Sequence, residues 1–100
     1  MAVRGSKTGR PIMALLDLLG RRWTLRVIWE LNRRRLSFRS LQDACGRISP
    51  TILNTRLAEL RHADIVALDE DGYALTVEGK RLIDELGGLH EWAERWAKRD

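Results

Sequence analysis

One face of the segment 50–62 carries small, mostly polar side chains whose chemistry suits recognition of a partner. Ser49 and Pro50 form a typical helix start, because serine can accept a hydrogen bond from a free backbone N–H and proline suits the first helical position. At about 100° per residue, one side of this helix is apolar and carries Ile52, Leu53, Leu57 and Leu60. The opposite side carries Thr51, Thr55, Ala58 and His62, with Asn54 and Arg61 beside them. Such small side chains add little to a core, so this face is expected to touch a partner.

The side chains on this face match the hydrogen-bonding edges of nucleic-acid bases. Asparagine can pair with the N6/N7 edge of adenine, and threonine can bond to several bases or touch a thymine methyl group. Asn54 is therefore the strongest candidate for base contact, followed by Thr51 and Thr55, and Ala58 would allow close approach. Six residues near this face are candidates for phosphate contact: Arg34, Arg35, Arg39, Arg47, Ser49 and Arg61.

A helix-turn-helix with a wing would position this face. Apolar spacing predicts helices at about 11–19, 21–35, 38–45, 50–62 and 76–98, and alternation around an Asp-Gly pair predicts a β-hairpin at 64–76. Two helices joined by a glycine-bearing turn and followed by a hairpin form a winged helix-turn-helix, which places its second helix in the major groove of DNA. The expected fold class is mainly α with a small β-hairpin wing, in the order α-α-α-α-β-β-α.

The apolar stripes of the helical segments predict the core. The first helix has one apolar stripe of Ile12, Leu15, Leu16 and Leu19. The second would face inward with Trp23, Val27, Ile28 and Leu31, and the third with Phe38, Leu41 and Cys45. Trp29 is also expected in the core, and Cys45 is expected to be a small core residue rather than a redox sensor. Arg56 lies at the edge of its buried stripe, so we expect it to pair with Glu59. Gly87-Gly88 leaves open whether the last helix bends or splits.

The charge distribution indicates a polyanionic partner. The formal net charge is +4, but residues 1–39 carry ten basic and two acidic residues, whereas residues 40–100 carry eight and twelve. A uniformly solvated surface would rarely separate charge in this way. Charge alone would suit RNA or a membrane surface equally well. Residues 1–10 are basic and almost free of apolar side chains, which predicts a flexible N-terminal arm before a single domain at 11–100.

Several classes of protein are not supported by the residue content. No apolar run approaches the ~20 residues of a membrane span, and the N-terminus has no apolar signal-peptide core. The single cysteine excludes an intrachain disulfide and fits the reducing cytoplasm. No nucleophile with a base, paired carboxylates, phosphate loop or metal-ligand spacing is present, so we expect no enzyme activity, cofactor or metal site.

Five features follow one another along residues 11–96 in a specific order. They are LDLLGRRWTLRVIWEL, Phe38 followed by Leu41, ISPTILNTRLAEL as one unit, YALTVEGKRLIDEL, and Trp92. Together they resemble the HxlR-type winged-helix regulators, a family close to the MarR group. The resemblance implies a homodimeric transcriptional regulator whose first and last helices form the dimer. Two recognition helices would then bind one DNA operator.

Large apolar residues on the terminal helices suit the implied dimer. Trp92 and Trp96 are too large to leave exposed on a last helix, and Leu89 shares their stripe. Met13 and Leu16 of the first helix would meet them across a two-fold axis, which would require an inverted-repeat operator. An effector pocket between the dimer helices is compatible with this arrangement, but no residue specifies its ligand.

Three positions depart from the family pattern. Arg10 stands where many relatives have a cysteine that in some senses oxidants or electrophiles, which puts thiol sensing by that route in doubt. The wing is short and acidic, with Asp69, Glu70 and Asp71, so we expect phosphates to repel it. Asp64 replaces the usual glycine after the recognition helix, and aspartate tolerates the left-handed backbone needed there.

Two alternatives to a sequence-specific regulator remain open at this level. A winged helix can also mediate protein–protein contact, with the basic half facing an acidic partner. The basic arm and the arginines at 33–35 could equally bind nucleic acid without sequence preference.

Overall fold

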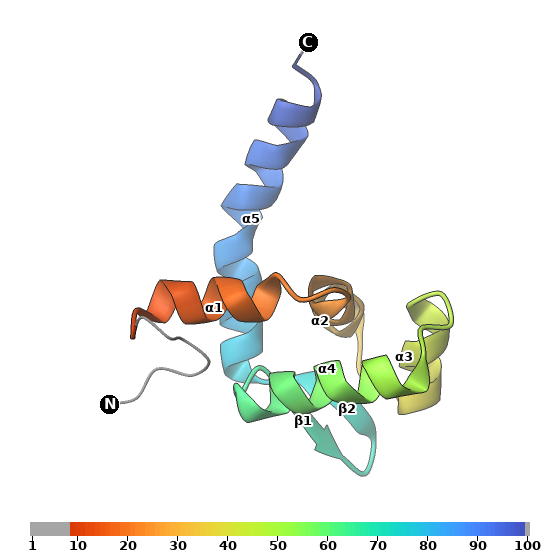
Figure 1. Cartoon of the computed structure of the whole chain (residues 1–100). Helices are drawn as coiled ribbons and strands as arrows, with labels where there is room; N and C mark the ends of the chain where they lie inside the picture. Colours follow the sequence, from red (N-terminus) through yellow and green to blue (C-terminus); the bar gives the residue numbers. More distant parts are fainter. Residues whose placement is uncertain (1–8, 100) are drawn as a thin grey trace.

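The computed structural model describes residues 9–99 and contains the expected order of elements. These are α1 (Pro11–Leu19), α2 (Thr24–Arg33), α3 (Phe38–Ala44), α4 (Pro50–His62), β1 (Val66–Asp69), β2 (Gly72–Leu75) and α5 (Val77–Ala97). Figure 1 shows the first half of α5 at one side of the body, where α1 crosses it, and the second half extending beyond the other elements. The fold is a winged helix-turn-helix, as the sequence predicts. Most of the expected basic arm, residues 1–8, lies outside the described residues.

Three of the helices are capped at their N-termini by a hydroxyl side chain. Ser37, Ser49 and Thr76 each accept a hydrogen bond from the backbone N–H three residues further on, at 3.1, 3.4 and 3.0 Å. Helix α2 has no such cap and follows Trp23, whose φ of 78° lies in the left-handed region. The start of α2 is therefore the one helix start after α1 that a side-chain cap does not explain.

A very close approach positions the start of α5 against the turn that follows α4. The backbone N–H of Thr76 donates to the carbonyl oxygen of Ile65 at 2.9 Å, and its hydroxyl donates to that of Asp64 at 2.6 Å. A Cβ atom at Gly79 would collide with the Ile65 carbonyl oxygen, so this position requires glycine. Helix α5 continues without a break through Gly87-Gly88. Within residues 9–99, no helix is long and apolar enough to cross a membrane.

The wing is a two-stranded hairpin with a short third segment at its edge. Strands β1 and β2 pair antiparallel from Val66↔Leu75 to Asp69↔Gly72, and Leu36 forms an isolated bridge to Tyr73. The chain leaving α2 is therefore hydrogen-bonded to the wing. Asp64 has a φ of 63°, which confirms that it adopts the left-handed turn after α4.

The core is formed by α2, α3, α4 and the base of the wing. Its least exposed apolar members are Val27, Ile28, Leu41, Cys45, Leu53, Leu57 and Leu60. The prediction that Cys45 is a core residue is confirmed, since it is 1% exposed. Burial of these apolar side chains, at about 25 cal/mol per Å², is the main stabilising contribution.

Two expected core residues, Trp29 and Ile52, are instead exposed, and the apolar stripe of α1 is only partly buried. Ile12 and Leu16 are 57% and 52% exposed, because α1 packs through Ala14 and Leu19. Trp29 is 52% exposed and lies beside the inward face of α2, against His90 of α5. Ile52 is 39% exposed at the edge of the α4 stripe. In each case the apolar residues do lie along one side of the helix, but the neighbouring element covers only part of that side.

Candidate nucleic-acid interface

Helix α4 presents its small polar residues to solvent and anchors its opposite side in the core. The side chains at 53, 57 and 60 are at most 1% exposed, so the helix cannot rotate without losing this burial. The exposed face contains all four residues expected to contact bases: Thr51, Asn54, Thr55 and Ala58. The helix-turn-helix therefore brings these residues together on one accessible surface.

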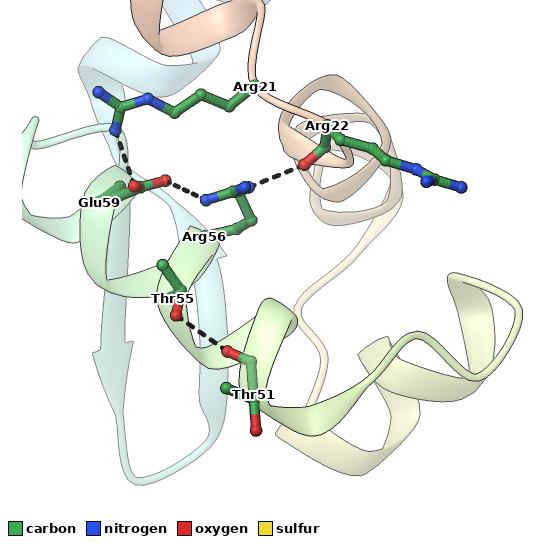
Figure 2. Close-up of polar contacts among 6 residues, drawn as sticks. All are labelled: Arg21, Arg22, Thr51, Thr55, Arg56 and Glu59. Atoms are coloured by element: carbon green, nitrogen blue, oxygen red, sulfur yellow. Dashed lines mark hydrogen bonds and ion pairs between the residues drawn. The ribbon is translucent and has the colours of Figure 1, made fainter.

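The hydrogen-bonding groups on this face are not equally available. The Thr55 hydroxyl donates to the Thr51 carbonyl oxygen at 3.0 Å (Figure 2), which uses its only proton. Thr55 therefore offers a methyl group and acceptor electron pairs to a partner. The Asn54 amide makes no hydrogen bond to any described residue, so its donor and acceptor groups are both available.

Five of the six candidate phosphate-binding residues are exposed and have no acidic partner within residues 9–99. These are Arg34, Arg39, Arg47, Ser49 and Arg61. Arg47 has a φ of 61° in the turn between α3 and α4. The sixth candidate, Arg35, already has an acidic partner, because its Nη1 lies 2.6 Å from Oδ2 of Asp69. A phosphate contact by Arg35 would have to replace this ion pair.

The wing is negatively charged at its tip. Asp69, Glu70 and Asp71 are all exposed. The pKa of Asp69 is lowered by a hydrogen bond from the Asp71 backbone N–H and then by Arg35, so this carboxylate stays ionised at neutral pH. Among residues 9–99, only the charge of Asp69 has a basic partner, which leaves a net negative surface at the end of the hairpin.

A set of arginines ties the connection between α1 and α2 to the side of α4 (Figure 2). Arg56 donates through Nε to the Arg22 carbonyl oxygen at 2.8 Å and through Nη1 to Glu59 at 3.0 Å. Glu59 also pairs with Arg21 at 2.7 Å. The expected Arg56–Glu59 pair is confirmed. The link to Arg21 and Arg22 was not predicted; the only sequence signal was the presence of two adjacent arginines before a tryptophan.

A second accessible surface is apolar and lies on the terminal helices. On α1, Met13 is 41% exposed, and on α5 Leu89, Trp92 and Trp96 are 61%, 52% and 60% exposed. The Trp92 and Trp96 rings stack on each other with centroids 5.8 Å apart. These residues lie on the half of α5 that extends beyond the rest of the chain (Figure 1).

The described part of the chain gives little support for a reactive cysteine or a metal site. Burial raises the pKa of the Cys45 thiol, an effect that exceeds the opposing influence of Arg26. No group of three histidine, cysteine or acidic side chains that could hold a metal ion occurs within residues 9–99.

Comparison with known proteins identifies the family. The model of the HxlR-like helix-turn-helix family matches residues 18–100, which include the whole of α2 to α5. The chain belongs to the HxlR-like helix-turn-helix family. This family includes transcriptional regulators with a helix-turn-helix DNA-binding domain, and the resemblance predicted from the sequence is therefore confirmed.

Individual similar proteins agree with this assignment in sequence and in structure. The chain is 30% identical over 88 residues to the uncharacterized HTH-type transcriptional regulator YvaP of Bacillus subtilis, covering 81% of this chain and 82% of YvaP. Quinone-bound YodB from B. subtilis superimposes with a TM-score of 0.80 at 28% identity, covering 84% of this chain and 96% of YodB. A possible HxlR family transcriptional factor from Thermoplasma volcanium has a TM-score of 0.75 at 26% identity, covering 90% and 87% of the two chains.

Proposed function

We propose that this HxlR-like protein is a homodimeric regulator that binds a specific inverted-repeat operator in DNA. The observation that carries the proposal is the exposed polar face of α4, on a helix anchored in the core. Thr51, Asn54, Thr55 and Ala58 would face the bases, with Asn54 as the main hydrogen-bonding residue. Phosphates would be held by Arg34, Arg39, Arg47, Ser49 and Arg61, while Arg35 would anchor the wing unless it gives up its bond to Asp69.

The dimer would form through α1 and the projecting half of α5. Support comes from the large exposed side chains of Met13, Leu16, Leu89, Trp92 and Trp96, since isolated domains rarely leave so much apolar surface in contact with water. A two-fold axis would bring each patch against its own copy. Two α4 helices would then enter successive major grooves about one helical turn, or a multiple of it, apart.

The remaining segments would support this role. Residues 1–10 would act as a basic arm that adds attraction to phosphates, and residues 11–100 would form the DNA-binding and dimerisation domain. Action on chromosomal DNA would place the protein in the cytoplasm. The dimer arrangement leaves room for an effector pocket between its helices, whose ligand no residue specifies. The buried Cys45 offers no accessible thiol of the kind that reacts with electrophiles.

A salt titration on two DNA duplexes tests the proposal. The operator is first selected from a random duplex library, and binding to it and to random DNA is then measured by fluorescence anisotropy. We expect a steep loss of affinity with salt on both duplexes and a preference of roughly 10³-fold or more for the operator. Equal affinity for both duplexes would indicate a non-specific nucleic-acid binder. No binding to either duplex would favour a protein–protein interaction module.

A further inference from the structure

The connection between α1 and α2 forms a basic hollow beside α4. An open space of about 340 Å³ is lined by Leu19, Arg21, Arg22, Trp23, Leu25 and Arg26. Half of these residues are arginines and none is acidic. We propose that this arginine hollow binds a phosphate of the DNA backbone next to the bases read by α4, with Arg22 as the contacting residue. The inference rests on the proposed function and adds a contact outside the helix-turn-helix.

Arg22 is the arginine of the hollow whose charge is available. Arg21 is paired with Glu59 at 2.7 Å, and Arg26 donates to Glu30 at 2.9 Å and to the Ala44 carbonyl oxygen at 2.8 Å. The guanidinium of Arg22 has no carboxylate partner within residues 9–99. It lies 5.5 Å from the centroid of the Trp23 ring, an arrangement that leaves its N–H donors free to bind the oxygens of a phosphate.

The backbone that carries Arg22 is held in place relative to α4. Arg56 of α4 donates to the Arg22 carbonyl oxygen, while the side chain of Arg22 points away from the Arg56–Glu59 pair (Figure 2). The Trp23 indole packs against the core, and the left-handed backbone of this residue turns the chain sharply into α2. Unusual backbone conformations of non-glycine residues often occur where a side chain must be held in a defined position. Arg22 would therefore bind a phosphate at a constant offset from Asn54.

The charge around α4 supports contact on this side. The α1–α2 connection and the wing lie on opposite sides of α4, above and below it in Figure 1. The wing carries Asp69, Glu70 and Asp71, which phosphates repel, whereas the arginine hollow attracts them. A helix in the major groove lies between two phosphate backbones. The helix would therefore be held more closely to the backbone on the side of the arginine hollow.

Removing the charge of Arg22 tests the inference, and removing a charge elsewhere on the protein provides a matched control. Arg22→Gln keeps a long polar side chain, and Lys98→Gln removes one exposed charge at the far end of α5. Full-length dimers of each variant are titrated with salt on the operator and on random DNA. We expect Arg22→Gln to reduce the slope of log affinity against log salt by about 0.9 for each phosphate that is no longer bound, or about 1.8 per dimer, on both duplexes. Lys98→Gln is expected to retain the wild-type slope.

A map of individual phosphates provides an independent measurement on the unmodified protein. Operator duplexes with one neutral methylphosphonate each should reveal a position in every half-site where the wild-type protein loses affinity and Arg22→Gln does not. A wild-type slope for Arg22→Gln, or equal sensitivity of both proteins at every position, would overturn the inference.

Failure of this inference can be separated from failure of the proposed function. If the wild-type protein prefers its operator and Asn54→Ala loses that preference while Arg22→Gln keeps its slope, only the arginine hollow is wrongly assigned. If the wild-type protein shows no preference among DNA sequences, the proposed function itself fails. Circular dichroism and thermal melts of each variant establish that the fold is intact.

Discussion

Asn54 and Thr55 are neighbours on the exposed face of α4, but they differ in what they can offer to DNA. The hydroxyl proton of Thr55 is already used within the helix, whereas the Asn54 amide has both of its polar groups free among the described residues. An amide in this state can form two simultaneous bonds to adenine. Sequence preference is therefore expected to depend more on Asn54 than on the threonines.

Replacing Asn54 tests this difference. We expect Asn54→Ala to weaken operator binding by about 1–3 kcal/mol and to leave binding to random DNA nearly unchanged, because only the operator offers the matching base edge. Fluorescence anisotropy on both duplexes measures the two affinities. Asn32→Ala, the same change at an exposed position on α2, serves as the control. An equal loss on both duplexes would mean that Asn54 contacts the backbone or supports the fold.

Cys45 is expected to be unreactive in the folded protein. Burial raises its pKa, so the thiolate fraction at neutral pH is smaller than that of a free cysteine, and the pH needed to form thiolate is higher. Alkylation by iodoacetamide at about pH 7.5, followed by mass spectrometry, should be slow in the native protein and fast after unfolding in guanidinium chloride. Rapid native labelling would show that the thiol is accessible and would reopen a redox role.

At the level of elements, one ion pair and one strand bridge link the wing to the segment that follows α2. Arg35 pairs with Asp69, and the next residue, Leu36, is bridged to Tyr73. The pKa of Asp69 lies below its ordinary value of 3.8, so its stabilising contribution is present above that pH and is lost as the pH falls through the lowered pKa. The ion pair therefore persists throughout the neutral range.

Neutralising Asp69 should strengthen DNA binding. Asp69→Asn removes a charge that repels phosphates and also releases Arg35 to bind one, whereas Glu70→Gln removes an equal charge without releasing a cation. We expect both variants to bind DNA more tightly, with the larger gain and the steeper salt dependence for Asp69→Asn. A gain of the same size in both variants would show that Arg35 does not reach a phosphate.

The contact between α5 and the turn that follows α4 predicts opposite effects for two glycines of α5. Gly79→Ala would force a Cβ atom into the Ile65 carbonyl group, so we expect a loss of about 1–3 kcal/mol in the free energy of unfolding. Gly87→Ala meets no neighbouring atom within 4 Å and should stabilise the helix by about 0.5–1 kcal/mol. Urea denaturation measures both. A neutral Gly79→Ala would mean that the two elements separate easily.

At the scale of the whole molecule, the projecting half of α5 carries apolar side chains that the core of a single chain does not cover. The second half of α5 projects from the body and carries Leu89, Trp92 and Trp96. Burying side chains of this size stabilises by about 1.5–3 kcal/mol each, or more for tryptophan. Because the described core does not reach them, a second copy of the chain would be their natural cover.

The double replacement of Trp92 and Trp96 by alanine tests dimer formation. We expect monomeric or unfolded chains in sedimentation experiments and loss of operator binding although Asn54 is retained. Arg99→Ala, an exposed change near the same end of the chain, should remain dimeric. A double variant that stays dimeric would move the interface elsewhere. A wild-type monomer that binds its operator fully would rule out an obligatory dimer.

Local signals in the sequence were sufficient to predict the winged helix-turn-helix and the exposed face of α4. Ser49 and Pro50 determine where α4 begins, and its apolar spacing determines which side is buried, because both effects act within one or two turns. The Asp-Gly pair predicted the hairpin turn for the same reason. The base-contacting and phosphate-contacting roles of individual residues remain predictions, since they depend on DNA.

Only the tertiary structure decided how much of the apolar side of each helix is buried. It also decided which charged side chains have no ionic partner among residues 9–99. Trp29 was expected in the core but is half exposed, because α2 packs through a neighbouring face and His90 of α5 covers its ring only in part. Arg22 looked like one basic residue among many until the bond from Arg56 placed it beside α4. These two arginines are 34 residues apart. The spacing of residues in the sequence shows which side of a single helix each one occupies. Contacts between two elements also depend on the angle and distance between their axes, which the packing of the whole core determines.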